Sequence, residues 1–135
     1  MSSPIDPRKL LECAVAAARA AGNHALQNRT RRKEVVKVLE HDIKLKLDIE
    51  CQEKAESVIQ KTYPDHKIIG EEDSKDNVNL QSSVVDSQDS MYEWIIDPID
   101  GTVNFAHGLP HWCASVAVRF QDQMMAGAVY VSSQN

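Results

Sequence analysis

The stretch Trp94-Ile95-Ile96-Asp97-Pro98-Ile99-Asp100-Gly101-Thr102 decides how this chain is organised around its candidate site. Its apolar start followed by two carboxylates predicts a buried strand that delivers Asp97 and Asp100 to a sharp turn. Pro98 lacks a backbone N–H and has a fixed φ, so we expect the strand to stop there and Asp100 to turn back toward Asp97. Glu71, at the end of an earlier predicted strand, supplies a further carboxylate.

These residues have the chemistry of a magnesium site that receives a phosphate. Mg²⁺ prefers oxygen ligands in octahedral geometry, so Glu71, Asp97 and Asp100 are a suitable set, and the Ile99 carbonyl is a candidate fourth ligand. The Gly101-Thr102 pair permits close backbone approach and can begin a helix whose unpaired N–H groups face an anion. Taken alone, the two acids fit a capping turn equally well, and it is the flanking Gly-Thr and upstream Gly-Glu-Glu that favour the metal site.

With these motifs the chain resembles the inositol monophosphatase family, the Mg²⁺-dependent and lithium-sensitive sugar phosphatases whose signature is D-P-I-D-G-T preceded by G-E-E. The resemblance is carried, in order and approximate spacing, by Lys37, Asp48, Tyr63-Pro64, Ile69-Gly70-Glu71-Glu72, residues 94–104 and residues 127–130. It implies Mg²⁺ as the cofactor and a layered sugar-phosphatase fold.

The resemblance also implies a role for each matched residue. The implied metal ligands are Glu71, Asp97, the Ile99 carbonyl and Asp100. The implied substrate-binding residues are Glu71, Asp100, Gly101 and Thr102. Asp48 is implied to pair with Thr102 and, with Glu71, to polarise the attacking water, which makes these three the expected catalytic residues. Without the family, Asp48 is better explained as an acid that stabilises the first turn of its own helix.

Two further features bear on the resemblance. Lys37 matches a basic residue near the metal site, although a solvated lysine explains it at least as well. The segment Asp42-Ile43-Lys44-Leu45-Lys46-Leu47 departs from the family pattern, because Leu45 and Leu47 replace threonines. This departure leaves the metal set intact and bears on substrate detail.

The length of the chain differs most from the family. Members are much longer than these 135 residues, and their second half supplies another metal-ligating Asp and most contacts to the sugar. We therefore expect residues 1–135 to be the N-terminal part of an inositol monophosphatase-like domain whose C-terminal half is absent. The resemblance implies a homodimer for the full-length family member.

The implied reaction is hydrolysis of myo-inositol monophosphate to inositol and phosphate. A related sugar or nucleotide phosphatase is an alternative, because bisphosphate nucleotidases, fructose bisphosphatases and histidinol phosphatases share the metal signature. A second alternative is a non-catalytic truncated product that binds metal or a full-length partner. The expected substrate in the enzymatic cases is a small phosphate monoester.

Composition excludes several other classes of protein. The net charge of −5 gives no electrostatic reason to expect nucleic acid as a partner. Cys13, Cys51 and Cys113 are widely spaced, which favours small buried thiols over a disulfide framework or a zinc site. We find neither a signal-peptide apolar region nor a stretch of the ~20 apolar residues that span a membrane. We therefore expect a cytoplasmic location and no membrane partner.

The periodicity of apolar residues predicts an α+β fold with two N-terminal helices packed on a mainly antiparallel sheet. Asp6-Pro7 predicts the start of the first helix, and Gly22-Asn23 predicts its end or a weak point. A solvated basic turn is expected over residues 28–33. The remaining expected elements are a helix over 47–61, strands over 67–69, 92–96, 111–120 and 124–131, a polar loop over 73–90 and a hairpin turn over 121–123.

Overall fold

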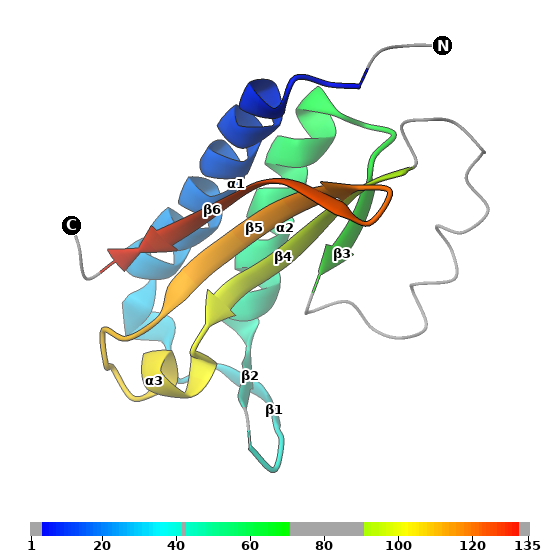
Figure 1. The fold of residues 1–135 in the computed structure, drawn as a ribbon. Helices are drawn as coiled ribbons and strands as arrows, with labels where there is room; N and C mark the ends of the chain where they lie inside the picture. The colour runs from blue at the N-terminus through cyan, green and yellow to red at the C-terminus, as the bar shows by residue number, and fades with distance from the viewer. Residues whose placement is uncertain (1–3, 42, 71–90, 133–135) are drawn as a thin grey trace.

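The computed structural model describes residues 4–41, 43–70 and 91–132. Its elements in chain order are α1 (Pro7–Gln27), the 3₁₀ turn η1 (Arg29–Arg31), β1 (Val35–Val38), β2 (Ile43–Leu45), α2 (Lys46–Thr62), β3 (Lys67–Gly70), β4 (Tyr92–Asp100), α3 (Thr102–Ala106), β5 (Cys113–Phe120) and β6 (Gln123–Val131). Figure 1 shows α1 and α2 side by side on one face of a sheet, with the β1–β2 hairpin and α3 at one end. The predicted α+β layering is confirmed.

The main sheet has the strand order β3-β4-β5-β6. β4, β5 and β6 pair antiparallel, whereas β3 pairs parallel to β4. The prediction of a mainly antiparallel sheet is therefore right, with one parallel pair added. Alternate residues of β5 are buried under the helices, among them Ala114, Val116 and Val118. The core lies between this face and the two helices.

The first helix begins as predicted but ends later. The side chain of Asp6 accepts a hydrogen bond from the Arg8 N–H at 3.0 Å, and Pro7 occupies the first turn. Gly22 does not end or break the helix, which continues to Gln27. A Cβ at Gly22 would overlap the ring of Tyr130 in β6, so this glycine allows α1 to lie close against the sheet.

The strand that carries the two aspartates also runs further than predicted. β4 continues through Pro98 to Asp100, so the expectation that Pro98 stops the strand is wrong. The pairing with β5 shifts here, because Asp97 lies opposite Ser115 and Asp100 opposite Cys113. One extra residue in β4 therefore forms a bulge, a place where a proline without an N–H removes no ladder bond.

The basic segment after α1 is tied into the fold more firmly than a solvated turn. Arg31 Nη2 lies 2.6 Å from Glu50 Oε2 of α2, and Arg31 Nε lies 3.1 Å from Glu34 Oε2. His24 Nε2 of α1 lies 2.8 Å from Glu50 Oε1. The β1–β2 hairpin follows, an element that the sequence pattern did not predict. No helix in the described part of the chain is long and apolar enough to cross a membrane.

Candidate functional site

A polar cavity of about 270 Å³ lies at the carboxyl end of β4. It is lined by His41, Asp97, Ile99, Asp100, Gly101, Thr102, Val103 and Asn104. All but one of these residues come from the quoted signature stretch and the first residues of α3. The structure thus brings the residues of this stretch around one hollow.

The bulge in β4 sets the directions of the two aspartates. Asp97 is half-buried and its Oδ1 atom is enclosed by protein, whereas Asp100 is exposed. Ile99 is 2% exposed, so it anchors the bulge in the core, and it also belongs to the lining of the cavity. Two carboxylates and a carbonyl therefore border the same space, which is a set of hard oxygen donors.

Gly101 makes the turn from β4 into α3. Its φ of +94° lies in the left-handed region, which strongly favours glycine. A Cβ at this position would also lie 2.9 Å from the backbone oxygen of His111. The turn consequently places Thr102 at the start of α3 with its side chain 8% exposed.

Thr102 joins three elements through its hydroxyl group. Its Oγ1 lies 2.9 Å from the Ile99 carbonyl oxygen and 3.4 Å from Asp48 Oδ1 in the first turn of α2. Asp48 is 1% exposed, and its Oδ2 accepts a hydrogen bond from the Leu45 N–H at 2.8 Å. Asp48 therefore contacts Thr102, as the resemblance implies. It also stabilises the first turn of its own helix, as the sequence alone suggests.

The β1–β2 hairpin contributes His41 to the cavity lining, and not Lys37, the residue that the family resemblance suggests. Lys37 lies on the exposed strand β1 opposite Lys44 and does not line the cavity. His41, at the hairpin tip, lines it instead and lies 3.8 Å from Glu40 Oε1. Nothing in the sequence around His41 signals this, because the hairpin brings it to the site only through tertiary packing.

The structure describes three of the four predicted metal ligands, Asp97, Ile99 and Asp100. Glu71 and Glu72 lie outside the described residues, as do Asp42 and the predicted loop 73–90. Within the described ranges no three His, Cys, Asp or Glu side chains form a cluster suited to a metal ion. Asp97, Asp100 and the Ile99 carbonyl nevertheless fit Mg²⁺ chemically, because all three offer oxygen and border a polar cavity.

Cys113 lies close to the acidic side chains at this end of the sheet. It pairs with Asp100 across the β4–β5 ladder, and its Sγ lies 4.0 Å from Asp100 Oδ2. Burial, followed by the negative charges of Asp100 and Asp97, raises the pKa of the Cys113 thiol. Burial also raises the pKa of Cys13 to about 11 and that of Cys51 to about 12, as expected of packed thiols.

The sequence and fold both match known proteins. A family model described as the inositol monophosphatase family matches residues 6–135. The chain is 38% identical over 128 residues to a protein named Nus factor SuhB from Pasteurella multocida, covering 93% of this chain and 45% of that one. It is 32% identical over 126 residues to a fructose-1,6-bisphosphatase/inositol-1-monophosphatase from Aquifex aeolicus, covering 92% and 44%.

Among solved structures, the extragenic suppressor protein suhB from Bartonella henselae superposes with a TM-score of 0.76 at 25% identity. The alignment covers 91% of this chain and 45% of that one. The chain thus spans less than half the length of these relatives. The described fold corresponds to the part of the Bartonella henselae structure that it covers.

Proposed function

Because this chain belongs to the inositol monophosphatase family, we propose that it is the N-terminal part of a Mg²⁺-dependent phosphomonoester hydrolase. The proposed substrate is myo-inositol monophosphate, which would be hydrolysed to inositol and phosphate. The observation that carries this proposal is the cavity in which Asp97, Asp100, Ile99, Gly101 and Thr102 meet. The comparisons support a phosphatase of this family. The inositol substrate is a finer proposal than the comparisons support.

In this proposal the metal is held by oxygen ligands from two places in the chain. Asp97, Asp100 and the Ile99 carbonyl would supply one part of the set, and Glu71 the other. When bound there, Mg²⁺ supplies charge neutralisation for the phosphate and activation of a water molecule. The acidic side chains could not receive a phosphate without such a cation, because like charges repel.

The remaining residues of the cavity orient the reactants. Gly101 carries no side chain, so a phosphate group can approach the backbone at the start of α3. The hydroxyl of Thr102 has one proton and two acceptors within reach, the Ile99 carbonyl and Asp48. We propose that the proton goes to Asp48 while the hydroxyl oxygen accepts from the attacking water. Asp48 and Glu71 would then favour deprotonation of that water.

A phosphatase for a different alcohol is the alternative within the same class. The Aquifex aeolicus relative is named for both fructose 1,6-bisphosphate and inositol 1-phosphate chemistry. The described cavity holds the groups that contact metal and phosphate, and these groups do not distinguish one sugar from another. Comparing the two substrates on the same protein separates the alternatives.

A non-catalytic role is the alternative from another class. The chain covers 45% of a relative named as a Nus factor, and a partial chain with the signature can bind metal without turnover. In that case the protein would act through binding Mg²⁺ or a full-length partner. Metal binding and phosphate release therefore have to be measured separately.

The test measures Mg²⁺-dependent phosphate release from inositol 1-phosphate and from fructose 1,6-bisphosphate, with calorimetry of Mg²⁺ binding alongside. Asp97→Asn removes a proposed ligand, and Asp65→Asn is the matched control because Asp65 is exposed and does not line the cavity. We expect Asp97→Asn alone to lose both metal binding and release. Faster release from the bisphosphate would favour the alternative substrate, and Mg²⁺ binding without release from either compound would favour the non-catalytic role.

A further inference from the structure

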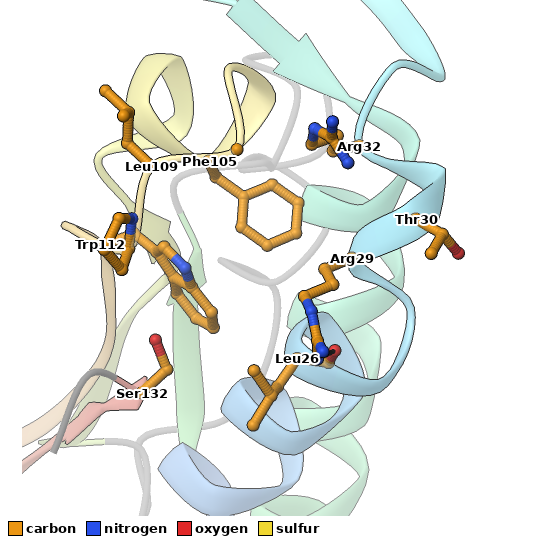
Figure 2. Close-up of a pocket in the computed structure, with 10 residues that line it drawn as sticks. Leu26, Arg29, Thr30, Arg32, Phe105, Leu109, Trp112 and Ser132 are labelled. Carbon is orange, nitrogen blue, oxygen red and sulfur yellow. Dashed lines mark hydrogen bonds between the residues drawn. The ribbon is translucent and has the colours of Figure 1, made fainter. Parts of the chain in front are cut away.

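A second and larger cavity lies between the end of α1 and the loop that follows α3. Its volume is about 370 Å³, and its lining shares no residue with the candidate site. Figure 2 shows Leu26, Arg29 and Arg32 on one side of it and Phe105, Leu109 and Trp112 on the other. Neither the family match nor the site residues discussed above assign anything to this cavity.

One wall of the cavity is apolar and rigid. The rings of Phe105 and Trp112 meet edge to face, with centroids 5.1 Å apart and an interplanar angle of 88°. Both residues are nearly buried, at 2% and 7% exposure, so their positions are held by the core. Leu109 extends this wall and is 48% exposed. Such a surface suits a flat apolar group, which gains from contact with aromatic faces and edges.

The opposite wall carries a positive charge, the guanidinium group of Arg32. The Nε atom of Arg32 is buried, and it has no hydrogen-bond partner among the described residues. Its neighbour Arg31, in contrast, is paired with Glu34 and Glu50. A buried donor without an acceptor is destabilising, because it has lost its hydrogen bonds to water. Because Nε itself is buried, an anionic ligand in the cavity would act through the charge of the guanidinium group rather than by accepting a hydrogen bond from Nε.

The geometry around Arg32 keeps its guanidinium group at the cavity. Gly108, with a φ of +78°, brings the backbone under the group, and a Cβ there would lie 3.2 Å from Arg32 Nε. Arg29 stands on the same wall, where its Nη1 donates to the Leu26 carbonyl at 2.9 Å. Among the described residues, no acidic side chain lines this cavity, although the chain as a whole has a net charge of −5. The cavity is therefore basic in an acidic protein.

We propose that this cavity binds a small organic anion with a flat apolar body and one carboxylate or sulfonate group. The ring system would pack on Phe105 and Trp112, and the anionic group would pair with the guanidinium group of Arg32. The volume is within the range of small-molecule pockets. This inference concerns a site separate from the proposed catalytic one and does not depend on the phosphatase function.

The test uses 2-naphthoate as the probe and 2-naphthamide as its neutral analogue of the same shape. Both are titrated into the 135-residue chain and followed by two-dimensional ¹H–¹⁵N NMR. We expect 2-naphthoate to shift the backbone amides of Leu26 and Phe105 and the indole N–H of Trp112. The amide analogue should bind about tenfold more weakly, the loss expected for one charge-assisted hydrogen bond.

Two variants separate the role of Arg32 from a general effect of charge. Arg32→Met keeps the apolar stem and removes the guanidinium group, and it should weaken 2-naphthoate binding about tenfold. Lys33→Met removes the same charge from the next residue, which is exposed and does not line the cavity, and should leave binding unchanged. Equal affinities for acid and amide in the wild-type chain would overturn the proposal even if Arg32→Met did not fold. Shifts centred on His41 and Asp100 would overturn it as well.

Discussion

The hydroxyl group of Thr102 connects the signature stretch to the rest of the fold. It bridges the bulge of β4 and the first turn of α2, through the Ile99 carbonyl at 2.9 Å and Asp48 at 3.4 Å. The sequence alone suggested a helix-stabilising role for Asp48, and the resemblance suggested a pair with Thr102. The structure places Asp48 where it makes both contacts, because its two carboxylate oxygens point in different directions.

Replacing this hydroxyl should reduce stability even without substrate. We expect Thr102→Val to lower the free energy of unfolding by about 1 kcal/mol, since a buried hydrogen-bonding group is replaced by a methyl group. Thr102→Ser retains the hydroxyl and should lose less. Urea denaturation followed by circular dichroism measures both. A valine variant as stable as the wild type would show that the bridge contributes nothing to folding.

At the scale of elements, helix and strand positions were predictable wherever local periodicity decides them. The boundaries that differ depend on distant residues. Gly22 resembles a helix end in the sequence, but its role is to make room for Tyr130 at the far end of the chain. Pro98 resembles a strand end, but a bulge opposite β5 accommodates it. His41 and the β1–β2 hairpin were missed because their placement has no local signal.

The contact between α1 and β6 determines whether replacing Gly22 by alanine stabilises or destabilises the protein. Alanine is intrinsically better than glycine inside a helix by roughly 1 kcal/mol. We nevertheless expect Gly22→Ala to destabilise the protein by about 1–3 kcal/mol, because the new methyl group would overlap the Tyr130 ring. In a Tyr130→Ala background the same change should become neutral or stabilising. Thermal and urea denaturation of the four proteins in this cycle provide the comparison, and a destabilisation of equal size in both backgrounds would contradict the steric explanation.

The ion network that ties α1, η1 and α2 together should make stability depend on pH. Hydrogen bonds from Arg31, and then from His24, lower the pKa of Glu50 from 4.5 to about 2. A lowered folded-state pKa means that the stabilisation is present above the unfolded value and is lost as the pH falls toward about 2. Most of the loss should therefore fall between pH 4.5 and about 2.

The variant Glu50→Gln isolates this contribution. It should lower the free energy of unfolding by roughly 1 kcal/mol at about pH 7, and the difference from wild type should shrink by about pH 3. Glu53→Gln is the matched control, because Glu53 is exposed on the same helix. Urea denaturation at the two pH values makes the measurement. A constant difference across the range would rule out Glu50 as its source.

At the scale of the whole molecule, the sequence was sufficient for the α+β class and for the packing of two helices on a sheet. It did not reveal that β3 runs parallel to β4, because strand pairing depends on contacts between distant segments. For the candidate site, the signature stretch identified most of the residues that line the cavity, whereas metal binding by its carboxylates stays a prediction. The expected role of Glu71 stays a prediction, as do the homodimer and the cytoplasmic location.

The sheet face opposite α1 and α2 has a consequence for how the chain behaves in solution. Val129 of the edge strand β6 is 60% exposed, and it pairs with Ser115 on this face. Apolar groups on an edge strand favour association with a second chain. We expect self-association that increases with protein concentration and weakens in Val129→Lys. Sedimentation velocity measures it, with Leu11→Lys on the outer side of α1 as the control, since Leu11 is 42% exposed. Equal behaviour of the two variants would exclude this face as the contact.

The short helix α3 borders both cavities, through Thr102 on the side of the proposed metal and phosphate and through Phe105 on the side of Arg32. A helix of Thr102–Ala106 is little more than one turn, so Phe105 and Thr102 lie about one turn apart. Any coupling between the two cavities must be reciprocal: the factor by which an aromatic acid changes the affinity for Mg²⁺ equals the factor by which Mg²⁺ changes the affinity for the acid. A ligand of the second cavity that changes the properties of the first would therefore do so without occupying the space proposed for the phosphate.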